Sequence, residues 1–527
     1  MATIQTDKAK NKNKISFFGA LLIVFGALIG AGIFFKSKSV IEGSGFNLAL
    51  AIASWIVACI SIIAMSFSLI EIASVSSKSN LSLIIWNKIF NSKFVYQLSK
   101  SFIIYAYLPF TYFVMPVYFM QMLQDAIAAF KLSESASWGL NFDWIIVLLV
   151  TLVVFYYFLV VGLNSKIAQK HNTVILFFKF IPIISTVILG FVFLAMGASN
   201  QLASQPQFSN ISNTITQGES LAKTLPGVGI LLSMAAIFFT YEGFFTVAGL
   251  QTEMKNPKKT PLAIMIGIAL TTIIYLLIAI ATSVVGDGSI SSFLQIAKDE
   301  LKWSQQVIQW IIGTTNLFIA ISILGIVNVF TMWGPRAIDE LIKNGELKFL
   351  EKWHHKYNQK TDKPIVASWF LAIISTVLII ILTLVGVYGY SDNTYNLYGE
   401  SLNNLYAFAD ISGNWSALIT FALIAASIYG GIQNRKTNLI TTQKIKYFKP
   451  LAYFSVISIV IILSSAFLIP IIDLFLLTGV DPNIENFNLI LKVRITKIIV
   501  LILFVFLPSL PAFYEKFKDK KLLSKNY

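Results

Sequence analysis

Long apolar segments separated by short polar stretches recur along nearly the whole chain. Most of them exceed the ~20 residues that an α-helix needs to cross a bilayer. We count about twelve, near 15–35, 46–75, 97–124, 143–162, 170–197, 226–250, 261–286, 305–334, 364–388, 402–430, 450–473 and 491–514. The short connections leave no room for a soluble domain. The pattern therefore predicts an all-α integral membrane protein with about twelve transmembrane helices.

The first apolar segment is interrupted by three glycines, Gly26, Gly30 and Gly32. Each weakens a helix by roughly 1 kcal/mol relative to alanine. An opened turn inside a bilayer must face protein or a water-filled cavity, and the N–H groups beginning the second half-helix would then attract a carboxylate. Small residues at this spacing also permit a close helix crossing, so both interpretations stay open. We expect the span to end at residues 34–35, before an outer loop containing Lys36, Lys38 and Glu42.

The sixth apolar segment has a comparable interruption at residues 239–243, where the sequence reads FTYEG. Glu242 places a carboxylate at mid-depth beside Gly243, and intramembrane charges are usually functional. A glutamate that only bonds a neighbouring helix is the alternative. Two breaks five spans apart are typical of inverted-repeat transporters. We therefore predict one repeat over about 15–197, a second over about 226–430, and two further helices within 450–514.

Three more charged residues fall within or near apolar segments. Lys179 lies about nine residues, roughly 13 Å, into the fifth segment, where a lysine costs about 2.5–3.5 kcal/mol. Packing gives no reason to accept that cost, so we predict a function for Lys179. Glu71, close to a membrane boundary, is more typical of snorkelling or helix packing than of ligand binding. Asp410 lies about eight residues into the tenth segment, where it would contribute to selectivity or cap a kink.

Composition and charge agree with a membrane location. Of 527 residues, 56% are hydrophobic and only 12% charged, which excludes an ordinary soluble protein. With the N-terminus inside, thirty of the 40 Lys and Arg residues fall on inner segments. The net charge of +15 is thus a topology signal, with inner-leaflet lipid as counter-charge, rather than a sign of nucleic-acid binding. We expect a multi-pass plasma-membrane protein without a cleavable signal peptide, comprising a cytoplasmic basic arm (1–14), a membrane domain (15–514) and a cytoplasmic basic tail (515–527).

The reactive residues argue against several kinds of chemistry. Cys59 is the only cysteine, so no intramolecular disulfide can form. The three histidines, His171, His354 and His355, do not cluster with other metal ligands. The phosphate-loop pattern G-x-x-x-x-G-K-[ST] is absent from the sequence. We therefore expect no metal, no cofactor and no enzymatic activity.

Four short motifs together resemble the amino acid–polyamine–organocation transporters, which have the LeuT-type fold. Residues 26–34 (GALIGAGIF) are similar to the first-span motif of that family, and residues 239–244 (FTYEGF) to its sixth-span motif. Residues 253–257 (EMKNP) resemble the inner loop that follows, and residues 335–345 (PRAIDELIKNG) the segment after the eighth span. The resemblance covers spans one to ten and implies a 5+5 inverted repeat followed by two helices.

Three departures from the family pattern concern substrate identity and gating. Phe245 stands where many members carry an acidic residue. Residues 77–80 (SKSN) replace a proline-glycine motif after Glu71. The loop between Pro257 and Pro261 is one residue short.

The resemblance implies a substrate site at the two breaks. The N–H groups of Ala31 and Gly32 would bind a substrate carboxylate, with Gly30 allowing close approach. The backbone carbonyls of Leu28, Phe239 and Glu242 would accept from the ammonium, and the Phe239 ring would close over the substrate. Further implied site residues are Ala27, Thr240 and Gly243, with Tyr107, Asn316, Asn328 and Asp410 as contributors to selectivity.

We therefore predict secondary active transport of amino acids by alternating access, as symport or exchange. The resemblance also implies protons as coupling ion, with Lys179 replacing the sodium of sodium-coupled relatives; a permanently charged brace is the alternative. An exchanger of polyamines or cationic amino acids is favoured if Glu242 and Asp410 both face the cavity. A membrane receptor or sensor that moves no solute is the alternative from another class. The amino acid carried and the oligomeric state stay open.

Overall fold

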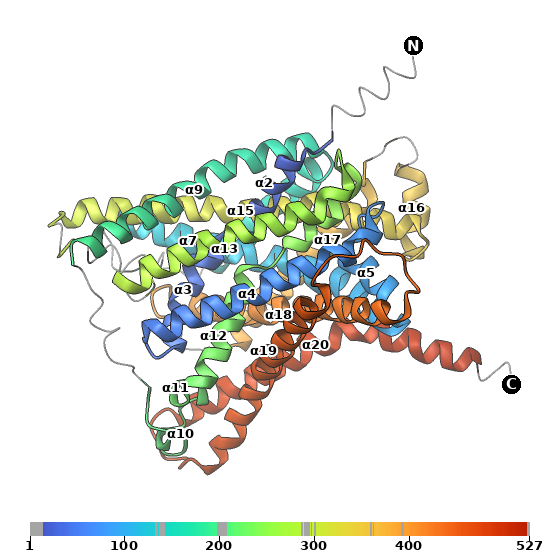
Figure 1. The fold of residues 1–527 in the computed structure, drawn as a ribbon. Helices are drawn as coiled ribbons and strands as arrows, with labels where there is room; N and C mark the ends of the chain where they lie inside the picture. Colours follow the sequence, from blue (N-terminus) through green and yellow to red (C-terminus); the bar gives the residue numbers. More distant parts are fainter. Residues whose placement is uncertain are drawn as a thin grey trace.

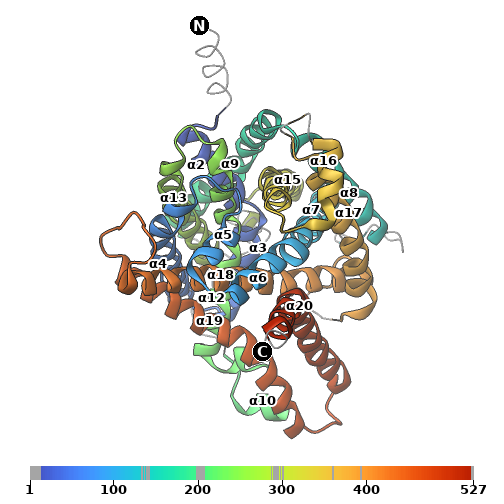
Figure 2. The ribbon, with the colours of Figure 1, turned by 90° about the vertical axis from the view of Figure 1, so that its right-hand side faces the viewer.

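The chain folds almost entirely into helices that pack as one bundle (Figures 1 and 2). The computed structural model describes residues 14–131, 143–197, 208–285, 302–358, 363–391 and 395–523, with isolated residues at 135, 137, 288, 296, 298, 299 and 361. Within these ranges, extended pairing is limited to an isolated parallel bridge between Ile15 and Met254.

Nine helices in the described ranges are long and apolar enough to cross a membrane. A bent pair, α2 (Phe17–Leu28) and α3 (Ala31–Gly43), makes a tenth when counted as one span. The other two predicted segments coincide with α8 (Asp143–Tyr156) and α20 (Phe487–Leu523), so the count of twelve stays a prediction. The nine are α4 (Leu48–Ala73), α6 (Lys93–Phe102) continued by α7 (Leu108–Phe130), α9 (Ser165–Ala195), α12 (Pro226–Thr240) continued by η5 (Phe244–Glu253), α13 (Thr260–Val285), α15 (Gln305–Lys343), α17 (Ile365–Leu384), α18 (Glu400–Thr437) and α19 (Phe448–Leu476).

Short helical pieces extend or connect these spans. Three of them are single π-helical turns that continue a longer helix, η2 (Ile103–Tyr107), η3 (Tyr157–Val161) and η7 (Val385–Gly389). The others are η1 (Ser74–Ser76), α5 (Leu83–Phe90), α10 (Ser212–Thr216), α11 (Leu221–Thr224), η6 (Pro257–Lys259), α16 (Lys348–Asn358) and η8 (Leu477–Gly479).

The first span is broken at the predicted place. α2 ends at Leu28 and α3 begins at Ala31, with extended backbone at Ile29 and Gly30 between them. The two half-helices are bent by 49°. Gly30 caps α3 without a side-chain hydrogen bond. The N–H groups in the first turn of α3 therefore have no partner within their own helix.

The glycines of this break also lie at close helix crossings. A Cβ on Gly30 would overlap the side chain of Ile326 on α15. A Cβ on Gly32 would lie 3.2 Å from the Cα of Thr240 on α12, and a Cβ on Gly26 would overlap the side chain of Asn172 on α9. The helix break and the close crossing, which the sequence left as alternatives, therefore both occur here.

The sixth span breaks by a different device. α12 ends at Thr240, and Gly243 then turns the chain with a φ of +96°, a conformation that favours glycine. The chain continues as the 3₁₀ helix η5, which is ten residues long. Such helices seldom exceed ~3–4 residues, and long ones often mark a hinge.

The two broken spans meet at the centre of the bundle. α3 packs against α12, and α2 packs against α13 and α9. α15 contacts α7 and α9, and it also contacts α2 and η5 of the two broken spans. α19 contacts α4, α12 and α18, and Figure 2 shows α19 and α20 at the edge of the bundle, away from α2, α9 and α15.

One prediction about the first span was wrong. α3 continues to Gly43 instead of ending at residues 34–35, so Lys36, Lys38 and Glu42 lie in the helix and not in an outer loop. Lys36 is buried because its ammonium pairs with Asp410 on α18. Local hydropathy cannot reveal a lysine whose partner lies so far away along the chain.

Candidate functional site

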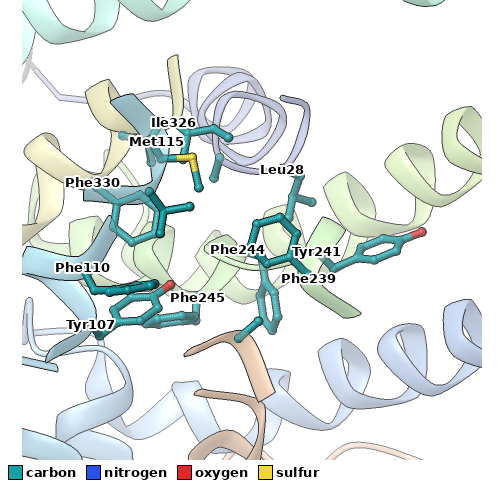
Figure 3. Packing of buried hydrophobic residues seen from close by; sticks show 14 of the residues in the cluster. Leu28, Tyr107, Phe110, Met115, Phe239, Tyr241, Phe244, Phe245, Ile326 and Phe330 are labelled. Atoms are coloured by element: carbon teal, nitrogen blue, oxygen red, sulfur yellow. The ribbon is translucent and has the colours of Figure 1, made fainter. Parts of the chain in front are cut away.

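A cavity of about 30 Å³ lies where the two broken spans meet. A single water needs about 10–15 Å³ measured this way, so the cavity is nearly closed. Figure 3 shows Ile326, Met115 and Phe330 on one side and Leu28 and Phe239 on the other. The full lining comes from α2, α3, α7, α15 and the end of α12 with the turn that follows: Ala27, Leu28, Gly32, Thr111, Met115, Tyr118, Phe239, Thr240, Glu242, Ile326 and Phe330.

Most of the predicted site residues come together here. Six line the cavity, namely Ala27, Leu28, Gly32, Phe239, Thr240 and Glu242. Gly30 and Gly243 lie in the adjoining backbone breaks rather than on the cavity wall, and α3 begins at Ala31. Four predicted contributors do not line it, namely Tyr107, Asn316, Asn328 and Asp410. The lining residues that the sequence analysis missed are Thr111, Met115, Tyr118, Ile326 and Phe330.

The carbonyls predicted to bind an ammonium are partly engaged by the protein. The Leu28 carbonyl accepts a hydrogen bond from the Tyr275 hydroxyl at 2.6 Å. The Phe239 carbonyl accepts one from the backbone N–H of Glu242 at 3.1 Å. A carbonyl oxygen has two lone pairs, so the Leu28 carbonyl retains one acceptor position for a ligand. The Phe239 carbonyl also accepts from the backbone N–H of Tyr241.

Two neighbouring polar groups in this region lack a hydrogen bond. Within the described part of the chain, neither the Oε1 atom of Glu242 nor the hydroxyl of Tyr107 has a partner, although both are buried. The Tyr107 ring is fixed between Phe245 and Phe330, with centroid distances of 5.6 Å to each. Buried polar groups are nearly always paired. The two groups lie close enough to interact with each other, and their remaining hydrogen-bonding positions are open to a water or ligand.

Lys179, on α9, contacts the first span at its break. Its ammonium donates to the carbonyl of Gly26 at 2.9 Å and also to the carbonyl of Ile29. The side chain is buried between α2 and α15, where a Cβ on Gly325 would come within 2.9 Å of Nζ. A cation at the C-terminal end of a half-helix is stabilised by the helix dipole and by these unpaired carbonyls.

Comparison with known proteins identifies the family of the chain. The sequence model of the family described as "Amino acid permease" matches residues 15–504. The chain belongs to the amino acid permease family. The permease is 37% identical to an uncharacterized protein of Mycoplasma pneumoniae, over 96% of this chain and 94% of that protein. It is 23% identical to the serine/threonine exchanger SteT of Bacillus subtilis, over 70% of this chain and 77% of that protein.

Solved structures with a similar fold are those of the Eremococcus coleocola manganese transporter. The structure with an aromatic bis-isothiourea compound and that of a point mutant each give a TM-score of 0.50 at 12% identity, with 95% of both chains covered. At this identity the likeness concerns the fold alone. In the permease, no group of three or more His, Cys, Asp or Glu among the described residues could hold a metal ion.

Beside the cavity, the permease contains an ion pair between a buried lysine and a partly exposed aspartate, which the sequence analysis missed. The Lys36 ammonium pairs with Asp410 and lies 4.8 Å from the centroid of the Phe239 ring. The Tyr118 hydroxyl donates to the same carboxylate at 2.9 Å. α3, α7, α12 and α18 are thereby joined on the side of the cavity that Phe239 covers. The sequence signal for this ion pair was the presence of two opposite charges, Lys36 and Asp410, in or next to apolar segments.

Breaking this ion pair should destabilise the permease more than replacing both partners. Lys36→Met leaves the partly exposed Asp410 carboxylate with Tyr118 as its remaining partner, so the loss should stay below the ~3–5 kcal/mol that is typical of a fully buried lone charge. The double variant Lys36→Met/Asp410→Asn carries no unpaired charge and should recover much of the loss. Thermal unfolding of both variants in detergent measures this; a double variant less stable than Lys36→Met would contradict it.

A second polar cluster joins the far ends of the two broken spans. The N–H of Ile15, just before α2, donates to the carbonyl of Glu253 at 2.9 Å, and the N–H of Lys255 donates to the carbonyl of Ile15 at 2.8 Å. Arg336 on α15 forms an ion pair with the Glu253 carboxylate and donates to Ser165 on α9 at 2.6 Å. The ends of α2 and η5 are therefore linked to each other and to the neighbouring helices.

Glu71 bonds to neighbouring segments of the protein and does not line the cavity, which agrees with its prediction as a packing residue. Its two carboxylate oxygens accept from Arg435 on α18 at 2.7 and 2.5 Å. The N–H of Ile445 donates to the same carboxylate at 3.1 Å. The group is buried and fixes the loop after α18 against the end of α4.

Proposed function

We propose that this permease carries amino acids across the plasma membrane by secondary active transport with alternating access. The observation that supports this most is the cavity at the meeting point of two broken spans, with Gly32 on its wall at the start of α3. Free N–H groups and the positive end of a helix dipole attract a carboxylate, the group that all amino acids share. Relatives named as a serine/threonine exchanger and as a cationic amino acid transporter agree with this substrate class.

We propose neutral amino acids rather than cationic ones as the substrates. A cationic substrate or a polyamine is favoured if Glu242 and Asp410 both face the cavity. Glu242 lines it, but Asp410 pairs with Lys36 and does not. One uncompensated carboxylate offers less to a diamine than two would. The exchanger of cationic amino acids therefore becomes the second candidate.

We further propose that Lys179 couples transport to protons. As an ammonium it satisfies the carbonyls of Gly26 and Ile29, the place that a bound sodium ion would take in sodium-coupled relatives. Loss of its proton would remove hydrogen-bond donors from this contact and free the end of α2. Protonation and the position of the first span would thereby be linked. A brace that keeps its charge throughout the cycle is the alternative.

Uptake into liposomes containing the purified permease tests the proposed transport. We expect labelled neutral amino acids to accumulate, with faster uptake when an inward pH gradient is imposed. Empty liposomes and heat-denatured permease serve as controls. Specific binding of an amino acid without any uptake or exchange would instead indicate a receptor or sensor.

The distribution of basic residues predicts which side of the membrane each connection faces. Ser212 on α10 should lie outside the cell, and Lys356 on α16 inside; both are exposed. In a background lacking Cys59, we expect a membrane-impermeant thiol reagent to label Ser212→Cys in intact cells and Lys356→Cys only after lysis. Labelling of Lys356→Cys in intact cells would show that this topology is wrong.

A further inference from the structure

The polar groups of the cavity are concentrated around Glu242. This carboxyl projects from the turn between α12 and η5, and its Oε1 atom is buried without a partner. The hydroxyl of Tyr107 is buried and unpartnered beside it. In Figure 3, Tyr107 lies at the opposite end of the cluster from Leu28, and therefore away from the first-span break. The hydroxyl of Tyr107 is thus separated from the place proposed for the substrate carboxylate.

The protein itself provides no counter-charge for Glu242. Among the described residues, the two buried lysines of the region are already committed: Lys36 to Asp410 and Lys179 to the carbonyls of α2. The titratable groups facing Glu242 are the phenols of Tyr107 and Tyr118. The Tyr107 hydroxyl is near enough to donate to one carboxylate oxygen. The remaining acceptor positions of Glu242 are then left to a water or to the substrate.

We propose that Glu242, positioned beside Tyr107, selects amino acids whose short side chain carries a hydroxyl group. This inference rests on the proposed function. A hydroxyl both donates and accepts, so it satisfies Glu242 whether that carboxyl is ionised or protonated, and it can also accept from the Tyr107 hydroxyl. A methyl group of the same size would offer neither group a hydrogen bond, and sites built to bind a hydroxyl reject such analogues strongly.

The size of the cavity also favours a substrate with a short side chain. With about 30 Å³ of space, the cavity admits a small side chain once the site opens slightly, whereas a long chain would have to displace an aromatic wall. Phe330 and Phe239 form those walls. The Phe239 ring is further held by the Lys36 ammonium at 4.8 Å from its centroid. Serine and threonine combine a hydroxyl with the required size.

Threonine and valine differ by a hydroxyl in place of a methyl group, so their competition isolates the proposed contact. Each is tested as inhibitor of labelled serine uptake by liposomes containing the full-length permease. We expect threonine to inhibit at a concentration about tenfold or more below that of valine, because valine offers Glu242 no hydrogen bond. Glu242→Leu should bring the two inhibition constants together, mainly by weakening threonine, and Tyr107→Phe should narrow the gap partially.

A matched control uses Met115, an apolar residue of the same cavity. Met115→Leu should leave the threonine-to-valine ratio unchanged, even if both constants shift together. Equal inhibition by threonine and valine in the wild type would overturn the inference while leaving amino acid transport intact, and would indicate a bound water at Glu242. Stronger inhibition by lysine or ornithine would overturn it in favour of a cationic substrate. If no amino acid is transported or binds, the proposed function itself fails.

Discussion

Replacing Gly32 by leucine should abolish amino acid binding. Gly32 lines the cavity at the start of α3, and a Cβ at this position would already lie 3.2 Å from the Cα of Thr240. The rest of a leucine side chain would occupy the small cavity and cover the N–H groups of the first turn. We expect a loss of affinity of at least about a hundredfold, equivalent to about 2.7 kcal/mol or more.

A second glycine variant separates this effect from general damage. Gly227, near the start of α12, has open space where a Cβ would stand. Gly227→Leu should therefore retain binding, while both variants should elute as folded protein in detergent. Binding is measured by protection against thermal unfolding and by inhibition of labelled uptake. Near-normal affinity in Gly32→Leu would show that the substrate does not bind at this site.

Replacing Lys179 by alanine should remove the pH dependence of uptake. The variant loses the donors to the carbonyls of Gly26 and Ile29, together with the group that we propose to exchange a proton. Uptake driven by an inward pH gradient should fall at least about tenfold if the coupled step limits the rate. Exchange of substrate at equal pH on both sides should be affected less. Initial rates over a pH series measure both quantities.

Two further variants distinguish proton coupling from a structural brace. Lys179→Arg keeps a positive charge that does not leave at ordinary pH, so under our proposal it should lose pH dependence, whereas a brace would be preserved. Lys170→Ala removes an exposed lysine from the same helix and should have no effect. Wild-type uptake that is insensitive to pH and to protonophores would refute the coupling role.

The backbone breaks were predictable because their causes are local. Three glycines in the first span and Glu242–Gly243 in the sixth weaken a helix wherever the chain places them. The depth of Lys179 within its segment similarly indicated a partner inside the membrane. Burying its ammonium inside the membrane costs free energy, which hydrogen bonds to unpaired acceptors offset. The break leaves carbonyls of α2 unpaired, and Lys179 donates to them.

The missed features depend on contacts between distant segments. Lys36 was placed in a loop because its partner, Asp410, is 374 positions away. Met115, Ile326 and Phe330 line the cavity but look like any other apolar residue of a membrane helix. The third span contains the π-helical turn η2, which ends at Tyr107 and shifts the faces of α7 that follow. Helical periodicity therefore could not show which side chains of this span face the site.

Competition by amino acid esters tests whether the start of α3 binds the substrate carboxylate. The preferred amino acid and its methyl ester share the side chain and the ammonium, and differ only in the charged group assigned to these N–H groups. In liposomes containing the wild-type permease, we expect the free amino acid to inhibit labelled uptake at least about tenfold more strongly than the ester, since charge-assisted hydrogen bonds are lost. Equal inhibition by ester and free amino acid would show that the start of α3 does not bind the substrate carboxylate.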